Sequence, residues 1–336
     1  MLSSRQRERI ARYAPFGAWV LWFDCAWLAA VVHLDLWAAI AREWPIALAM
    51  ALGSYVAGST PMGGGTVGFP ILVLLFDEPV GLGRNFSFLI QSVGMSSATL
   101  LILCSRKPLA LRPLLWTLAT ATIVVPIANR LLVPVVTPAA VKLIFAVIWA
   151  GFGVMTLFKL RDLLRTHRTD MLSSRGDAIV GVCVGVVGGT AAALTGVGID
   201  MVMYTVLVLL YRCDLRIAIA TSVIAMAWTS IVGTINAAAL GEIDAAVLSK
   251  WAAAAPVVLV GAPIGAFMLH VLPRGGTLVF VSVLCLAQFF WALERVGPGA
   301  VGIALSIGGV LLLNACFHLL YNWGGRRLSS AATGTG

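Results

Sequence analysis

Long apolar runs separated by short polar connections recur along the whole chain. Runs of about 20 residues can cross the hydrocarbon core of a bilayer as α-helices. Continuous spanning helices are predicted over residues 16–36, 85–104, 113–133, 139–160, 217–240, 251–272, 277–293 and 299–323. Two other apolar segments, 45–76 and 178–211, are each broken by a stretch rich in Gly and Thr. The pattern predicts an all-α polytopic membrane protein with about eight spanning helices plus two broken helical hairpins.

The two interruptions resemble each other. The first reads Thr60-Pro-Met-Gly-Gly-Gly-Thr-Val-Gly-Phe-Pro70, and the second reads Thr190-Ala-Ala-Ala-Leu-Thr-Gly-Val-Gly-Ile-Asp200. When their Val-Gly pairs are aligned, Asp200 falls opposite Pro70, and a new apolar helix follows each break. Paired broken helices in the two halves of a membrane protein indicate the substrate site of a transporter.

Composition narrows the class of protein. Of the 336 residues, 60% are hydrophobic and 11% are charged, whereas soluble domains carry about 25% charged residues. The net charge of +9 comes from Lys and Arg in short connections, where it orients a membrane protein, so we expect a lipid bilayer and no nucleic acid as partner. The six cysteines have no metal or redox spacing, and no nucleophile or P-loop motif occurs, so we expect neither a cofactor nor an enzyme.

Charge in the connections predicts the topology. If each broken segment crossed the membrane once, the basic connections around Lys107 and over 161–177 would lie outside, against the positive-inside rule. If each segment enters and returns on one side, these connections lie inside, and Asp77 and Glu78 lie outside. Both termini are then cytoplasmic, and the hairpins open to opposite sides. This arrangement is an inverted-topology repeat, and the hairpins are either re-entrant or two short crossings.

The predicted organisation has two membrane halves. Residues 1–160 form an extra first helix plus the first repeat, 161–177 a basic cytoplasmic linker, 178–325 the second repeat, and 326–336 a flexible tail. The first helix is unusually polar, because it contains Asp24 and His33. If it lies in the membrane interface instead of spanning, the whole topology inverts.

The breaks also carry the candidate chemistry. Irregular backbone at membrane depth is tolerated where it is buried in protein or lines a cavity, and the free amides of a helix start attract anions. Pro70 suits the first turn of such a helix. The predicted substrate-binding residues are Thr60, Gly63, Gly64, Gly65, Thr66, Gly68, Asn85, Ser87, Gln91, Thr195, Gly196, Gly198, Thr221 and Ser222. The alternatives are that the glycines only permit close helix packing and that the hydroxyls bond their own helices.

Asp200 is the sharpest single residue of the two breaks. An ionisable group inside a membrane is a functional hypothesis by default. Asp200 is therefore predicted to bind a coupling proton or to hold a gate, and the alternative is that its carboxylate caps the helix start.

The two motifs resemble the signatures of a known family. Residues 58–72 with Gly83-Arg-Asn-Phe-Ser87 and Gln91-Ser-Val-Gly-Met95 are similar to the first signature of the TauE/SafE family of sulfite and organosulfonate exporters. Residues 195–200 and Ala220-Thr-Ser222 are similar to its second signature, and the resemblance covers about 45–271. It implies an anion site formed by the two breaks between the halves.

The resemblance implies a secondary transporter, an anion permease. We expect it to export sulfite or an organosulfonate across a bacterial inner membrane by alternating access. One alternative is an ion-coupled importer of a small carboxylate or sulfur-containing anion. An alternative of another class is an anion channel.

Overall fold

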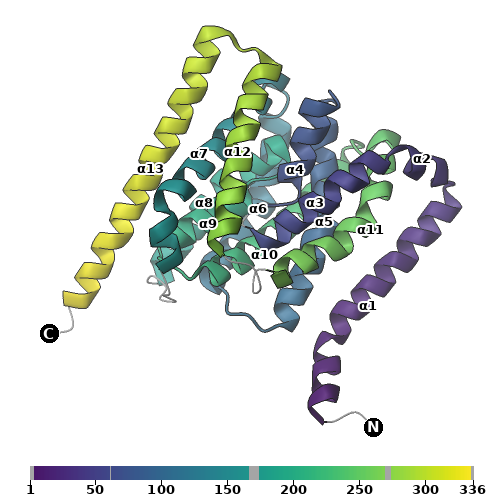
Figure 1. Cartoon of the computed structure of the whole chain (residues 1–336), viewed down its shortest axis with the longest axis horizontal. Helices are drawn as coiled ribbons and strands as arrows, with labels where there is room; N and C mark the ends of the chain where they lie inside the picture. The colour runs from purple at the N-terminus through teal and green to yellow at the C-terminus, as the bar shows by residue number, and fades with distance from the viewer. Residues whose placement is uncertain (1–3, 61, 166–173, 269–273, 334–336) are drawn as a thin grey trace.

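The computed structural model describes residues 4–60, 62–165, 174–268 and 274–333 (Figure 1). Every element in these ranges is helical, so the predicted all-α class is confirmed for the described residues. The elements are α1 (Ser4–His33), α2 (Trp37–Arg42), α3 (Trp44–Ser59), α4 (Gly65–Pro70), the π-helix η1 (Ile71–Leu75), α5 (Val80–Cys104), α6 (Leu111–Leu131), α7 (Pro138–Arg165), α8 (Ser174–Thr195), α9 (Ile199–Leu209), α10 (Leu215–Ala239), α11 (Ala245–Met268), α12 (Arg274–Val296) and α13 (Gly299–Thr333).

Nine helices within the described ranges are long and apolar enough to cross a membrane. Eight of them correspond to the continuous helices expected from the sequence, and the ninth is α8, the first arm of the second broken segment. The matching arm of the first segment, α3, has only 16 residues. The second arms, α4 with η1 and α9, are short apolar helices of 11 residues each. The two hairpins therefore differ in the length of their first arm.

Helices from before and after residues 166–173 pack together in pairs. α3 packs against α11, α6 against α8, α5 against α10, and α7 against α12. The short second arms are largely buried among these pairs. Figure 1 shows α1 and α13 at opposite edges, and the first turns of α1 and the last turns of α13 lie toward the same edge. The core thus contains the two breaks, and α1 and α13 cover its flanks.

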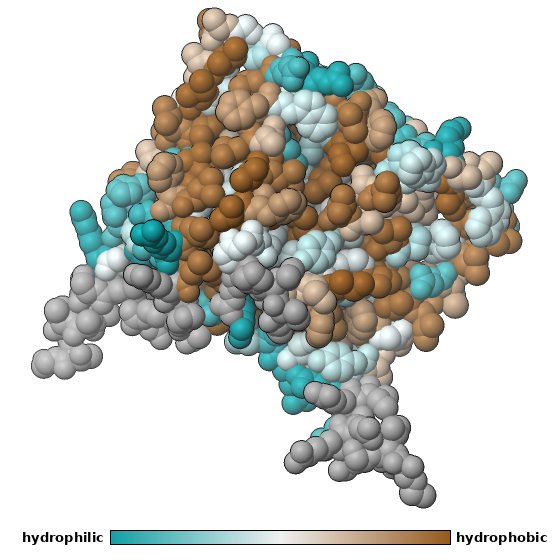
Figure 2. Space-filling model, in the orientation of Figure 1, coloured by the Kyte–Doolittle hydropathy of each residue, from teal (hydrophilic) through white to brown (hydrophobic). Residues whose placement is uncertain are grey.

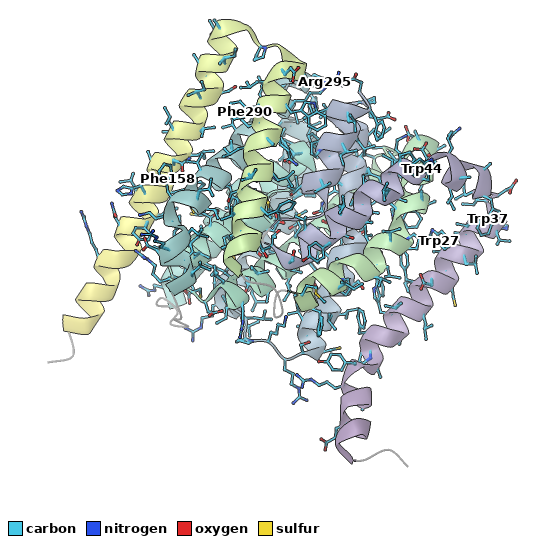
Figure 3. The ribbon with its side chains drawn as sticks, in the orientation of Figure 1. Trp27, Trp37, Trp44, Phe158, Phe290 and Arg295 are labelled. Atoms are coloured by element: carbon cyan, nitrogen blue, oxygen red, sulfur yellow. The ribbon has the colours of Figure 1, made fainter. Side chains whose placement is uncertain are left out.

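The outer surface is apolar over most of its extent. Figure 2 shows a broad hydrophobic face with hydrophilic residues gathered mainly at its margins. Phe158 of α7 and Phe290 of α12 point outward in Figure 3 and are 84% and 66% exposed. Arg295 lies near one margin, with its guanidinium 3.8 Å from the carboxylate of Asp77. Large apolar side chains exposed in this way suit contact with lipid.

Three helices, α1, α7 and α13, extend further than the sequence pattern suggested. α1 contains a candidate span over Ala11–His33 and packs against α5 and α11, where the indole Nε1 of Trp27 donates to the carbonyl of Ala252 at 2.9 Å. The helix is therefore long and apolar enough to span in spite of Asp24 and His33. α7 continues to Arg165, into the expected linker, and α13 continues to Thr333, into the expected tail.

Candidate functional site

The first break lies between Ser59 and the start of α4 at Gly65. None of its three glycines has a positive φ, so the chain does not need glycine here for its dihedral angles. It needs glycine for space. A Cβ on Gly63 would lie 2.0 Å from the side-chain oxygen Oε1 of Gln91, and one on Gly65 would lie 2.3 Å from Cγ1 of Val197. The missing side chains let α5 and the second break approach the first.

Pro70 does not begin a helix, so this expectation was wrong. α4 starts five residues earlier, and Pro70 is its last residue, followed by the π-helical turn Ile71–Leu75. Proline has no N–H and cannot donate to the carbonyl four residues earlier, which is that of Thr66. The side-chain Nε2 of Gln288 on α12 donates to this carbonyl instead, at 3.1 Å. Counted from the helix starts, Asp200 is therefore the counterpart of Thr66 rather than of Pro70.

The second break needs glycine for a different reason. Gly196 and Gly198 have φ values of +79° and +117°, a region that other residues rarely adopt. Gly198 precedes the first residue of α9, Ile199. The Oγ1 of Thr195 donates to a carbonyl on one side of the turn, that of Ala191 at 2.9 Å or that of Val197 at 3.0 Å. The turn is thus set by backbone conformation.

Gln91 of α5 joins the two breaks. Its Nε2 donates to the carbonyl of Ser87 at 2.9 Å and to the carbonyl of Gly196 at 3.0 Å. Its Oε1 points at Gly63 in the first break. A Cβ on Gly196 would meet Ser87 and Arg84 of the same helix, at 2.7 Å and 2.6 Å. One face of α5 therefore contacts both breaks, which the chain separates by about 130 residues.

Asp200 lies in the first turn of α9, against the first break. Its Oδ1 accepts from the amide of Met201 at 2.9 Å. Its Oδ2 has no hydrogen-bond partner and lies 3.0 Å from the position a Cβ on Gly63 would take. The side chain is 1% exposed. An ionised carboxylate at this helix start occupies the place where the dipole would otherwise attract an external anion.

The remaining predicted site residues fall into two groups. The hydroxyls of Thr60 and Ser87 donate to carbonyls of their own helices, and Gly68 packs against Met50 and Phe86. The hydroxyl of Thr66 is buried without a partner, and a Cβ on Gly64 would lie 3.5 Å from Met50 and 3.9 Å from Gln91, at ordinary contact distances. Ser222 likewise donates to a carbonyl of its own helix, that of Ile219. The second group bonds connections between helices: Asn85 donates to the carbonyl of Glu242, and Thr221 accepts from the amide of Ala110.

The starts of α5 and α10 carry different sets of charged side chains. Arg84, 4% exposed, makes an ion pair with Glu242 of the α10–α11 connection at 2.6 Å. At the start of α10, Arg216 lies near Lys107 of the α5–α6 connection, and burial, followed by the charge of Arg216, lowers the pKa of Lys107. The start of α5 is therefore tied by an ion pair, whereas the start of α10 holds two cations and the carboxylate of Asp214, which accepts from the amide of Arg216.

Two buried residues at the breaks were missed in the sequence. Gln288 supports Thr66, and its Oε1 has no partner. A proline inside a helix leaves the carbonyl four residues earlier without its backbone donor. Pro70 was therefore a signal in the sequence that a side-chain donor to Thr66 was needed. Trp149 of α7 is fully buried, with carbons 3.6 and 3.9 Å from the Cβ position of Gly198 and its indole Nε1 unpartnered. Nothing in its local sequence distinguishes it from a core tryptophan.

The site is closed. The cavity beside Gly64 and Gln91 has a volume of about 10 Å³, which is about the space that one water molecule needs. This cavity, on the α3 and α11 side of the first break, has no room for an oxyanion.

The fold and its long apolar helices define a multi-pass membrane protein. A family model described as Sulfite exporter TauE/SafE matches residues 46–291, well over half of the chain. The chain belongs to this family, which consists of transporters and not of enzymes. Comparisons with curated proteins and with solved structures gave no match.

Proposed function

We propose that this protein is a secondary transporter that exports a small oxyanion, sulfite or an organosulfonate, by alternating access. One observation carries the proposal: the breaks of both halves meet at Gln91, whose amide donates to Gly196 and whose oxygen faces Gly63. Such convergence of two helix starts is how many transporters build a midplane site. The family supports an anion of the sulfite class as substrate.

The helix pairing supports two repeats of inverted topology. If α3–α7 correspond to α8–α12 in order, the pair α3–α11 is the counterpart of the pair α8–α6, and both pairs pack closely. In the pairs α5–α10 and α7–α12, each helix packs against its own counterpart in the other repeat. Repeats related in this way can exchange conformations, so that the state open to one side converts into the state open to the other.

Electrostatics supports export. Moving one charge through 100 mV is worth about 2.3 kcal/mol, so a dianion leaving a cell held at about −150 mV gains roughly 7 kcal/mol, or about five decades of concentration ratio. Export then needs no coupled ion. The cations Lys107 and Arg216, on the side assigned to the cytoplasm, suit attraction of an anion from within.

Efflux from proteoliposomes tests the proposal. Purified protein is reconstituted with sulfite inside, and a potassium–valinomycin potential of either sign is imposed. We expect saturable efflux that follows the potential and shows counterflow, and protein-free vesicles give the background. Sulfite retained at both potentials, together with flux of another anion, would exclude the substrate while retaining the transporter. Flux that neither saturates nor shows counterflow would indicate a channel.

A second candidate function is ion-coupled import of a small carboxylate or sulfur-containing anion. The buried carboxylate of Asp200 favours it, because uptake against the membrane potential needs a coupled cation. Asp200→Asn should then abolish pH-dependent accumulation. A uniporter that exports by the potential alone would keep its driving force in this variant.

A further inference from the structure

Two buried oxygen atoms lie beside the same point of the first break, and neither makes a hydrogen bond. The Oε1 of Gln91 and the Oδ2 of Asp200 lie 2.0 Å and 3.0 Å from the same point, the Cβ position that Gly63 lacks. Both side chains are 1% exposed, and neither oxygen has a hydrogen-bond partner. Two acceptors left together in a dry site are unfavourable, because each loses its hydration without replacement.

Reversing the amide of Gln91 does not resolve this conflict. Its Nε2 already donates to the carbonyls of Ser87 and Gly196, and a flipped amide would set Oε1 against those two carbonyls. The missing donor must therefore come from Asp200. Only a protonated carboxyl can supply it, since an ionised carboxylate accepts and does not donate.

We propose that a proton held on Asp200 Oδ2 and donated to Gln91 Oε1 locks the two breaks together in the closed state. The proton site joins α9 of the second half to α5 and the Gly63 turn of the first half. Loss of the proton places a negative charge beside the unpartnered Oε1 of Gln91 in a buried site. Deprotonation therefore favours separation of the breaks, which is the movement that opens the site.

No other charge competes for this proton. Within the described part of the chain, Asp200 forms no ion pair, its Oδ1 accepts from the Met201 amide, and the backbone amides of Gly63 and Gly198 are the other polar groups beside its carboxyl. Tyr204 follows one turn later on α9 itself. The titratable or charged groups on the helices packed against α9 and on α5, with described side chains, are Arg84, Cys104, Lys142, Lys159, Arg161, Asp162, Arg175, Asp177, Cys183, Arg216, Cys316, His318, Tyr321 and Arg326. None of these side chains forms a hydrogen bond or an ion pair with Asp200 in the described part of the chain.

Infrared spectroscopy of the purified full-length protein tests the proton site without relying on transport. A protonated carboxylic acid has a carbonyl stretching band that a carboxylate lacks. We expect this band at neutral pH in the wild type and its loss in Asp200→Asn. The control is Asp177→Asn, which removes another fully buried carboxyl, bonded to the hydroxyl of Tyr211, and should leave the Asp200 band in place. In Gln91→Leu the band should shift to higher frequency, because the acceptor is gone.

Each result decides the question. Loss of the band in Asp200→Asn and its shift in Gln91→Leu support the proton lock. A spectrum unchanged by either substitution overturns it, as does a sodium-dependent rise in thermal stability that Asp200→Asn abolishes, since sodium would then be the bound ion. If Asp200→Asn does not fold, the shift in Gln91→Leu alone decides.

The consequence for flux rests on the proposed export function and is measured separately. Acid should slow wild-type efflux by favouring the locked state. The amide of Asp200→Asn is a permanent donor to Gln91, so this variant should be slow at every pH. A carboxylic acid band from Asp200 without any anion flux would refute the export function and leave the proton lock standing. Efflux that depends on pH without this band would refute the proton lock and leave the export function standing.

Discussion

The two breaks use glycine for different physical purposes. In the first, Gly63 and Gly65 have ordinary dihedral angles and are needed because neighbouring atoms occupy the space of a side chain. In the second, Gly196 and Gly198 adopt positive φ values, and at Gly196 the neighbouring backbone is close as well. Two motifs that look alike in the sequence therefore respond differently to the same substitution.

The chemistry at the two helix starts differs too. Thr66 and Asp200 are each the second residue of their helix, so a neutral hydroxyl in one half corresponds to a carboxyl in the other. The carboxyl of Asp200 belongs to the second helix start but also borders Gly63 of the first break. Of the two helix starts, only that of α9 therefore carries a titratable group.

The largest effect is expected for Gly196→Ala. A left-handed conformation costs about 1–2 kcal/mol for a residue with a Cβ, and the new atom would lie 2.6 Å from the backbone oxygen of Arg84, which cannot move away alone. With about 1–3 kcal/mol for overpacking, the loss of stability is about 2–5 kcal/mol. Thermal unfolding in detergent measures it, and an unchanged midpoint would contradict the assigned turn.

A smaller loss of stability is expected for Gly63→Ala. Its φ is ordinary, and the clash is with the side chain of Gln91, which can rotate away. The cost is about 1–3 kcal/mol, but Gln91 then leaves the carbonyl of Gly196, so transport should fall more than stability. Parallel measurement of unfolding and of sulfite counterflow checks this. Equal losses in the two assays would show that Gly63 has a packing role alone.

Gln288→Leu should cost about 1–3 kcal/mol, because it leaves the buried carbonyl of Thr66 without a donor. Only the first break contains a proline, so this dependence is specific to it. Pro70→Ala restores a backbone N–H that can bond Thr66, and the double variant should regain part of the lost stability. A double-mutant cycle on unfolding midpoints measures the coupling. Strictly additive effects would refute the link.

The smallest effect is expected for Gly64→Ala, the matched control for its two neighbours. The nearest atom to the new Cβ is the methyl carbon of Met50, 3.5 Å away, and Gly64 has a helical φ of −57°. The change in stability should stay within about 0.5 kcal/mol. A loss as large as that of Gly63→Ala would show that the whole glycine run needs flexibility rather than space.

The sequence alone determined the class of protein, the spanning segments and the presence of two related breaks. These features depend on local composition: apolar runs of bilayer length, and glycines where a helix is interrupted. Local composition also pointed to Gln91 and Asp200, because a polar or ionisable side chain in an apolar helix is costly and indicates a functional role. It misjudged Pro70, since the alignment of Val-Gly pairs does not reveal where a helix begins.

Only the tertiary structure decided which of these residues come together. Gln91 bonds the carbonyl of Gly196, and Gln288 bonds the carbonyl freed by Pro70, over separations that no periodicity encodes. Asn85 and Thr221, equally polar in the sequence, bond the connections at the helix ends instead. The reason is physical. A buried polar atom must find its partner wherever packing brings one within hydrogen-bond distance, and that packing depends on the whole chain.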